Sequence, residues 1–344
     1  MAASIEDVAK LAGVSIATVS RSLRGLPDVA TATRDRVLAA AQELDYVASP
    51  FAARLASGRS STLGVVVPFV NRWFFAEVLG AVESVLSKAN YDLLLHNLAD
   101  SEGRAEFFSA LPVRKRVDAV LVVSLALTDD EVAALKTLKL PVGVLGVKHP
   151  GMFSVRIDDV AAARTAVDHL LSLGHRRIGL IGGDTADPMR FTPPHHRGTG
   201  YREALTAAGI TPDPELEVLG YFTVAGGEAA MQTLLRMPER PTAVFAESDE
   251  MAYGAIKAIR RHGLQVPADI AVIGFDDHAT AELMDLSTIR QPVAEQGAVL
   301  AQQLLDCLAG ELEASDQVLG TELVVRGSTV AGESIYATAT PESV

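Results

Sequence analysis

The chain has 344 residues, which exceeds one ordinary domain and favours two or three units with sizeable apolar cores. Its 49% of hydrophobic and 5% of aromatic residues exclude a disordered or collagen-like chain, and its one cysteine, Cys307, excludes an intrachain disulfide. The formal net charge is −13, but residues 1–60 carry seven basic and six acidic side chains, a net charge of +1, so contact with nucleic-acid phosphates is excluded outside this segment.

The first predicted elements are three short helices. Ser4 and Asp7 have the spacing of a capping box, which predicts the start of the first helix. Gly13 interrupts the helical pattern, and Ser15 offers the N-cap of a second helix that ends near Leu23. A third helical pattern follows and can close a small core over the other two. Two short helices joined by a glycine turn form a candidate helix-turn-helix within residues 1–48, although the spacing alone fits a three-helix bundle without a nucleic-acid role equally well.

Residues 49–62 are expected to form a hinge helix and a linker, with GRSST at 58–62 as a flexible joint. Pro50 can begin a helix, and Leu55 presents the kind of apolar wedge that minor-groove binders insert between base steps. Because unstacking a step is costly for one short helix, we expect two such helices to share the kink. This favours a symmetric homodimer on a pseudo-palindromic site.

The rest of the chain alternates apolar runs with helical patterns, which predicts an α/β core with two doubly wound lobes. The expected strands lie at 63–69, 91–97, 119–124, 142–146, 177–183, 243–248 and 270–277, and helices include 158–173, 198–208 and 249–262. We expect lobe 1 at about 63–160 and 291–320, lobe 2 at about 161–290 and 321–335, and a disordered tail at 336–344. Ligands of such lobes bind at the carboxyl ends of the strands, so the functional residues should follow the strands.

Several sequence motifs of the chain resemble those of the lactose-repressor (LacI/GalR) family. SIEDVAKLAGVSIATVSR at 4–21 resembles the head of that family at nearly every position, and SPFAARLA at 49–56 is similar to its hinge helix. In the core, GHRRI at 174–178, RGTGY at 197–201 and IGFDD at 273–277 stand in family order and spacing. The resemblance implies a helix-turn-helix head on a periplasmic-binding-protein-like core. It also implies a sequence-specific DNA-binding transcriptional regulator, with a repressor expected, whose operator affinity is controlled by a small-molecule effector, a sugar being the expected class.

In such heads the second helix enters the major groove of double-stranded DNA. By position, the resemblance implies that Ile16 and Ala17 choose the operator, and their apolar side chains suit thymine methyl groups. A core position for Ile16 is the alternative, but Val14 and Val19 already fill that side. The complete set of residues expected at the DNA is Ser15, Ile16, Ala17, Thr18, Ser20, Arg21, Arg24, Ala52 and Leu55.

Two residues match effector contacts of the family. Arg197 matches the arginine that reaches into the pocket, and Asp276 matches the carboxylate that accepts hydrogen bonds from ligand hydroxyls. Together they suit a polyhydroxylated ring. The aromatic walls are expected from Phe69, Trp73, Phe75 and Phe222, with ordinary core packing an equally open reading of each. Arg190 lies in a loop that looks longer than in relatives and is also expected to line the site.

Other classes of function find little support in the sequence. It contains no nucleophile elbow, P-loop or Gly-x-Gly-x-x-Gly motif, so we expect no enzyme, no cofactor and no metal. A solute-binding protein would suit the core, but it would need an export signal and would not need residues 1–58. With no such signal and no apolar run of 18 residues, we expect a cytoplasmic protein without a membrane partner. Release from DNA by an inducer is favoured; recruitment by a corepressor, including a non-sugar metabolite, stays open.

Overall fold

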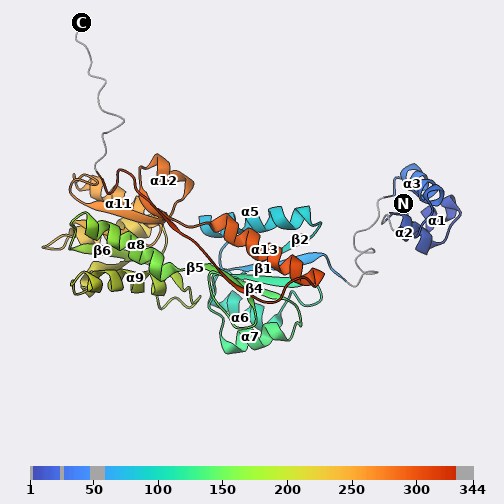
Figure 1. Cartoon of the computed structure of the whole chain (residues 1–344), viewed down its shortest axis with the longest axis horizontal. Coiled ribbons are helices and arrows are strands. Elements are labelled where there is room, and N and C mark those ends of the chain that lie inside the picture. The colour runs from blue at the N-terminus through green and yellow to red at the C-terminus, as the bar shows by residue number, and fades with distance from the viewer. Residues whose placement is uncertain (1–2, 24–26, 47–58, 331–344) are drawn as a thin grey trace, which may run out of the picture. The chain divides into compact units, whose positions relative to one another are not determined.

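The computed structural model describes residues 3–23, 27–46 and 59–330 (Figure 1). The chain divides into two compact units. One contains Met1–Thr62 together with Lys115–Asp118, and the other contains the remaining residues from Leu63 onward. The two units are described in turn as the head and the core. Among the described residues, no helix combines the length and the apolar character that crossing a lipid bilayer requires.

The head contains α1 (Ile5–Ala12), α2 (Ile16–Leu23) and α3 (Thr31–Glu43). The Ser4 side chain accepts a hydrogen bond from the main-chain N–H of Asp7, and the Asp7 carboxylate accepts one from the N–H of Ser4, which completes the expected capping box. Gly13 ends α1 at φ 65, where a residue without a Cβ is favoured. The three helices pack around one small core of Val8, Ala9, Ala12, Val19, Val37, Ala40 and Ala41. The predicted three-helix head is confirmed.

The linker immediately before the first strand is fixed by hydrogen bonds. The main-chain N–H groups of Ser60 and Ser61 each donate to the Asp118 carboxylate at 2.8 Å, and Ser60 Oγ donates to it at 2.9 Å. These hydrogen bonds connect Ser60 and Ser61 to Asp118 within the segment 58–62 that the sequence predicts as a flexible joint. Sequence reasoning did not predict this contact, because Asp118 lies far along the chain.

The core contains two six-stranded sheets (Figure 1). The first has the order β2-β1-β3-β4-β5-β11, with bounds β1 (Thr62–Val67), β2 (Asp92–Asn97), β3 (Ala119–Val123), β4 (Val142–Leu145), β5 (Phe153–Ile157) and β11 (Asp316–Leu319). The second has the order β7-β6-β8-β9-β10-β12, with bounds β6 (Ile178–Gly182), β7 (Glu217–Leu219), β8 (Ala243–Ala246), β9 (Ala271–Asp276), β10 (Ser287–Arg290) and β12 (Glu322–Val324). The same winding order thus occurs twice, and it confirms the predicted doubly wound α/β core.

Helices cover the faces of both sheets. The first sheet carries α5 (Trp73–Lys88), α6 (Ser101–Ala110), α7 (Asp129–Lys136) and α13 (Val293–Ala309), and α5 lies beside α13 in Figure 1. The second sheet carries α8 (Asp159–Ser172), α9 (Pro193–Ala207), α10 (Val224–Leu235), α11 (Asp249–Arg261) and α12 (Ala279–Leu283), with a short 3-10 turn at Pro214–Leu216. The central strands are fully buried because helices shield both faces, which explains their uninterrupted valine, leucine and isoleucine runs.

The chain passes between the two sheets three times. It crosses from β5 to α8, from β10 to α13, and from β11 to β12. We call these three connections the crossovers. The strand β12 is antiparallel to β10, whereas β11 runs parallel to β5. Each lobe is therefore completed by a strand from the end of the chain.

One helix of the core differs from the expectation. α9 begins at Pro193, five residues before the predicted start at 198, because proline is tolerated in the first turn of a helix.

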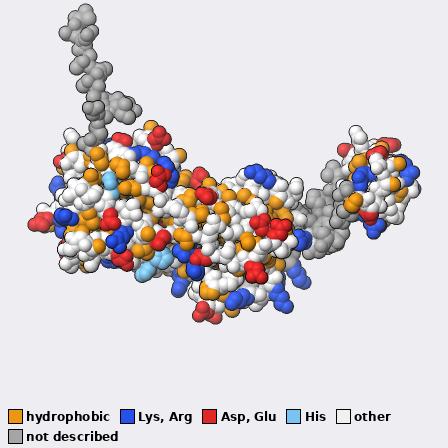
Figure 2. All heavy atoms as spheres, in the orientation of Figure 1, with side chains coloured by type: hydrophobic (Ala, Val, Ile, Leu, Met, Phe, Trp, Pro, Cys, Tyr) orange, Lys and Arg blue, Asp and Glu red, His pale blue; other side chains and the backbone are white. Residues whose placement is uncertain are grey.

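The visible face of the core carries acidic and basic side chains interspersed with apolar and uncharged ones (Figure 2). That face offers no broad basic surface of the kind that binds phosphates.

Candidate functional site

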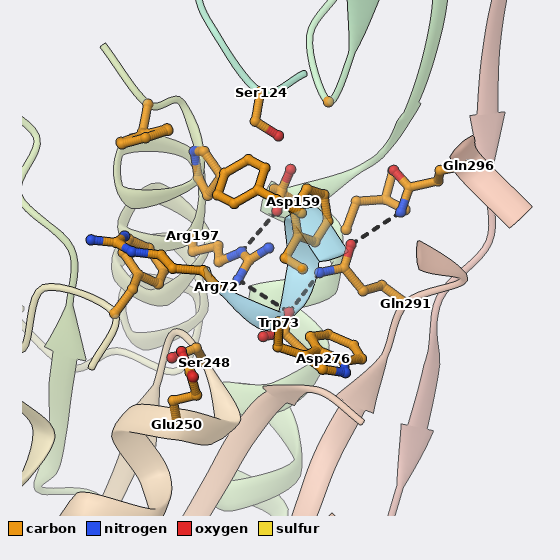
Figure 3. A pocket seen from close by; sticks show the side chains of 17 residues that line it. Arg72, Trp73, Ser124, Asp159, Arg197, Ser248, Glu250, Asp276, Gln291 and Gln296 are labelled. Carbon is orange, nitrogen blue, oxygen red and sulfur yellow. Dashed lines mark hydrogen bonds and ion pairs between the residues drawn. The ribbon is translucent and has the colours of Figure 1, made fainter. Parts of the chain in front are cut away.

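A pocket lies between the two sheets of the core, where strands of both sheets end. Figure 3 shows side chains converging on it from both lobes and from the crossovers. The first lobe contributes the start of α5 and the loops after β3 and β4, and the second lobe contributes α9 and the loops after β8 and β9. The polar lining consists of Arg72, Ser124, Asp159, Arg197, Ser248, Glu250, Asp276, Gln291 and Gln296.

Arg197 is the central cation of this pocket. It is buried on α9, its Nε donates to Asp159 Oδ1 at 2.8 Å, and its Nη1 donates to the main-chain oxygen of Glu247. The guanidinium carbon lies 3.6 Å from the centre of the Phe275 ring, so the plane of the group is fixed as well. Its Nη1 is 3.9 Å from Asp276 Oδ1. The guanidinium is thus held in place before any ligand arrives.

Asp276 faces Arg197 from the end of β9. Its Oδ1 accepts a hydrogen bond of 2.6 Å from Gln291 Nε2, and Gln291 Oε1 accepts one of 3.1 Å from Gln296 Nε2. Burial raises the pKa of Asp276 to about 7, against the opposing effects of Arg197 and Gln291. Near neutral pH the carboxyl group is therefore able to accept or to donate a hydrogen bond to a ligand hydroxyl.

Two further carboxyl groups lie behind this pair. Glu247 is 1% exposed and receives a hydrogen bond of 2.8 Å from the N–H of Gly183; burial raises its pKa to about 8. Asp249 is completely buried, and its Oδ1 accepts a hydrogen bond of 2.6 Å from Thr288 Oγ1. Burial, together with the nearby Asp276, raises the pKa of Asp249. Several carboxyl groups thus surround one arginine, and burial favours the protonated form of some of them.

The apolar walls are aromatic. The Trp73 ring lies 4.7 Å from the His278 ring, and Trp73 is the one tryptophan of the chain. Phe222 also lines the pocket, and a Cβ on Gly183 would be 2.2 Å from its ring, so only glycine fits there. Phe74, Phe75 and Phe191 complete the walls. Flat apolar surfaces beside a few hydrogen-bonding groups are typical of small-molecule sites.

At this pocket the structure brings together five of the seven residues that the sequence suggested, namely Trp73, Phe75, Arg197, Phe222 and Asp276. The other two lie outside its lining. Phe69 packs against Phe75 and Phe191, with ring centres 6.3 and 5.9 Å apart, behind the wall. Arg190 is exposed, whereas its main-chain oxygen accepts a hydrogen bond from the N–H of Ala126.

Sequence reasoning missed the pocket residues on the crossovers. Asp159 follows β5, and Gln291 and Gln296 follow β10. Neither strand appeared among the expected ones, so no signal pointed to the residues after them. Arg72 and Glu250 were also missed; the Arg72 guanidinium stacks 4.2 Å from the centre of the Phe69 ring.

The head presents the start of α2 to solvent. Ser15 Oγ caps the helix by accepting from the N–H of Thr18 at 3.1 Å. Ile16 is 47% exposed, so its placement outside the core is confirmed, while Val19 is fully buried. Ala17 and Arg21 are exposed, and Thr18 and Ser20 are half-buried. Arg24, Ala52 and Leu55 lie outside the described residues.

Comparisons with known proteins agree with both halves of this description. Residues 4–49 match the model of bacterial regulatory proteins of the lacI family, and residues 167–329 match a periplasmic binding protein-like domain. The transcriptional repressor CytR of Escherichia coli (strain K12) is 36% identical over 333 residues, covering 95% of this chain and 96% of that protein. The transcriptional regulator CelR of Thermobifida fusca is 36% identical over 342 residues, covering 94% and 98%.

Solved structures extend the comparison to the whole fold. The CelR–cellobiose complex superimposes with a TM-score of 0.70 at 34% identity, over 95% of this chain and 99% of that one. The lac repressor dimer bound to operator and the anti-inducer ONPF superimposes with a TM-score of 0.86 at 28% identity, over 96% and 100%. The chain therefore belongs to the lacI family of bacterial regulatory proteins and is a DNA-binding transcriptional regulator.

Proposed function

We propose that the chain is a repressor that binds a pseudo-palindromic operator as a homodimer and releases it when a sugar occupies the pocket. The observation that carries the proposal is the pairing of Arg197 with Asp276 in an aromatic-walled pocket of a chain that also has an exposed helix-turn-helix. We place this activity in the cytoplasm, where the operator is, and assign no catalytic role to the pocket.

The hydrogen-bonding capacity of the pocket suits a polyhydroxylated ligand. Arg197 donates from Nε to the Asp159 carboxylate and from Nη1 to the main-chain oxygen of Glu247. Its remaining N–H groups can donate to ligand oxygens. Asp276 accepts through Oδ1 from Gln291 and has Oδ2 for a ligand hydroxyl. Trp73 and Phe222 offer flat faces for the C–H side of a sugar ring. The relative CelR is known in complex with cellobiose, which supports the sugar class.

On the DNA side, we propose that Ile16 and Ala17 contact bases in the major groove and that Ser15, Thr18, Ser20 and Arg21 contact phosphates or base edges. Arg24, Ala52 and Leu55 are proposed from the sequence alone, with Leu55 as the minor-groove wedge. A homodimer would present two such heads to the two half-sites.

Because the crossovers join the two lobes, ligand binding in the pocket can be coupled to DNA binding by the head. A ligand that contacts Arg197 and Asp276 in one lobe and Trp73 in the other favours one relative angle of the lobes over another, which shifts the population of the DNA-binding form. Such coupling typically amounts to about 1 to 3 kcal/mol.

A second candidate is a corepressor-dependent regulator that responds to a non-sugar metabolite. The observation in its favour is that Arg72 and Glu250 both line the pocket, where burial lowers the pKa of Arg72 and raises that of Glu250; a zwitterionic metabolite would offer each of them a group of opposite charge.

The proposal is tested by selecting binding sites from random duplex DNA with the full-length protein at near-physiological salt. We expect an enriched palindrome with the wild type and with Leu38→Glu, and none with Ile16→Glu, since both side chains are 47% exposed on the head but only Ile16 lies on the first turn of α2. Enrichment that survives Ile16→Glu would contradict the DNA-contact assignment. Enrichment that requires an added metabolite would favour the second candidate.

A further inference from the structure

The loop at 184–191 joins β6 to α9 in the second lobe and is shaped by its own aspartates. The N–H of Ala186 donates to Asp184 Oδ1 at 2.8 Å, and the N–H of Met189 donates to Asp187 Oδ1 at 2.7 Å. These side-chain turns replace helix or strand hydrogen bonds. The loop ends at Phe191, which lines the pocket and packs 6.5 Å from the Phe75 ring of the first lobe.

A buried arginine of the first lobe holds this loop. Arg104 on α6 is 4% exposed, and its Nε and Nη2 donate to the two carboxylate oxygens of Glu131, both at 2.7 Å. Its Nη2 also donates to the main-chain oxygen of Ala126 at 2.8 Å, and its Nη1 donates to the main-chain oxygen of Met189. In addition, the N–H of Ala126 donates to the main-chain oxygen of Arg190 at 3.3 Å. Two hydrogen bonds thus attach the loop of one lobe to the other lobe.

The first lobe alone fixes the orientation of Arg104. Glu131 also accepts from the N–H of Thr128 at 2.7 Å as part of the capping box of α7. Although burial opposes it, the hydrogen bonds from Arg104 and Thr128 hold the pKa of Glu131 below its ordinary value, so the charge pair is complete. A buried arginine is tolerated only when its donors are satisfied. The acceptor for Nη1 is the main-chain oxygen of Met189 in the second lobe. The loop therefore supplies one of the hydrogen bonds that stabilise the buried charge of Arg104.

We propose that Arg104 is a positioning residue of the pocket: it clamps the loop at 184–191 of the second lobe to the first lobe and so keeps Phe191 in the pocket wall. Opening the pocket then requires breaking the Arg104–Met189 and Ala126–Arg190 hydrogen bonds together. The effect on the effector rests on the proposed function, whereas the clamp itself does not.

Hydrogen exchange of the full-length protein without ligand tests the clamp. Arg104→Lys keeps a positive charge beside Glu131 but lacks the planar fork that reaches both carbonyl oxygens. We expect amides at 184–191 and the amide of Ala126 to exchange about tenfold faster, as for the loss of one net hydrogen bond, with α6 unchanged. The matched control is Arg156→Lys, because Arg156 is also bidentate to a carboxylate of its own lobe, Asp316, at 3.1 Å. Unchanged exchange of the loop, or equally faster exchange throughout α6 and α7, overturns the clamp.

Two further measurements keep the test decisive. In the wild-type protein the amides of Ala126, Met189 and Arg190 should share one opening rate although they belong to different lobes; distinct rates overturn the proposal even if Arg104→Lys does not fold. The link to the pocket is read from acrylamide quenching of Trp73, the only tryptophan. Quenching should increase in Arg104→Lys and not in Arg156→Lys. A faster-exchanging loop with unchanged quenching would overturn the role in the pocket, and none of these results depends on DNA binding.

Discussion

Replacing Glu247 by Gln should remove much of the pH dependence of the stability of the second lobe. Glu247 is 1% exposed, and the N–H of Gly183 donates to its carboxyl group at 2.8 Å. Burial raises its pKa from the ordinary 4.5 to about 8, against the opposing effects of Gly183 and Arg197. A glutamine of the same shape can accept the same hydrogen bond and has no charge to lose or gain.

The magnitude follows from proton linkage. Because the folded-state pKa lies above the unfolded one, the folded protein binds more protons between pH 4.5 and 8, and the free energy of unfolding falls as the pH rises through this window. Each pKa unit corresponds to about 1.4 kcal/mol. Between pH 6 and pH 8 the wild type should therefore lose about 2 kcal/mol relative to Glu247→Gln, once partial ionisation near the upper end is included.

The assay is urea denaturation of the full-length protein at pH 6, 7 and 8. The difference in the free energy of unfolding between Glu247→Gln and the wild type should grow with pH. Glu322→Gln serves as the control, because Glu322 has a side chain that is 66% exposed and its ion pair with Arg290 is screened by solvent. A difference that stays constant with pH, or that shrinks as the pH rises, would refute the argument that burial keeps Glu247 protonated.

Three other changes test the remaining parts of the chain. Ser4→Ala removes the capping box of α1 and should lower the free energy of unfolding of the head by about 1 kcal/mol in thermal denaturation; an unchanged melting curve would mean that the cap is dispensable. Asp276→Ala should abolish the effector response in operator-binding titrations while leaving operator affinity intact, and a normal response would place the effector elsewhere. Leu55→Ala should weaken operator binding in the same titrations and spare effector binding; unaltered affinity would eliminate Leu55 as the wedge.

Elements with a local chemical cause could be predicted from the sequence. The capping box at Ser4, the glycine at position 13 and the uninterrupted apolar strands each follow from interactions within a few residues. The strands β5 and β10 could not be predicted in this way. Their sequences FSVRI and STIR contain buried hydroxyl groups at Ser154, Ser287 and Thr288, and the partners of the last two lie far along the chain. For example, Thr288 Oγ1 donates to Asp249.

The pocket residues likewise fall into those that the sequence could predict and those that it could not. Arg197 and Asp276 stood out by resemblance to a family, and both line the pocket. Asp159 and Gln291 did not stand out, because their neighbourhood exists only after both lobes have folded. Side-chain direction was also beyond the sequence: Phe69 and Arg190 belong to segments adjoining the pocket, but one packs behind the wall and the other extends into solvent.

Two of the three crossovers carry a residue of the pocket, Asp159 on the first and Gln291 on the second. This has a consequence for how such a regulator can diverge. We expect a substitution at either position to alter both the preferred ligand and the angle between the lobes, so that a new specificity acquired there also changes the strength or sign of the response. Phe222 lies away from the crossovers and in the same lobe as Arg197 and Asp276, so we expect substitutions there to change the ligand while leaving the response intact. After gene duplication, we expect substitutions to accumulate first in the aromatic wall of the pocket and last at the crossovers.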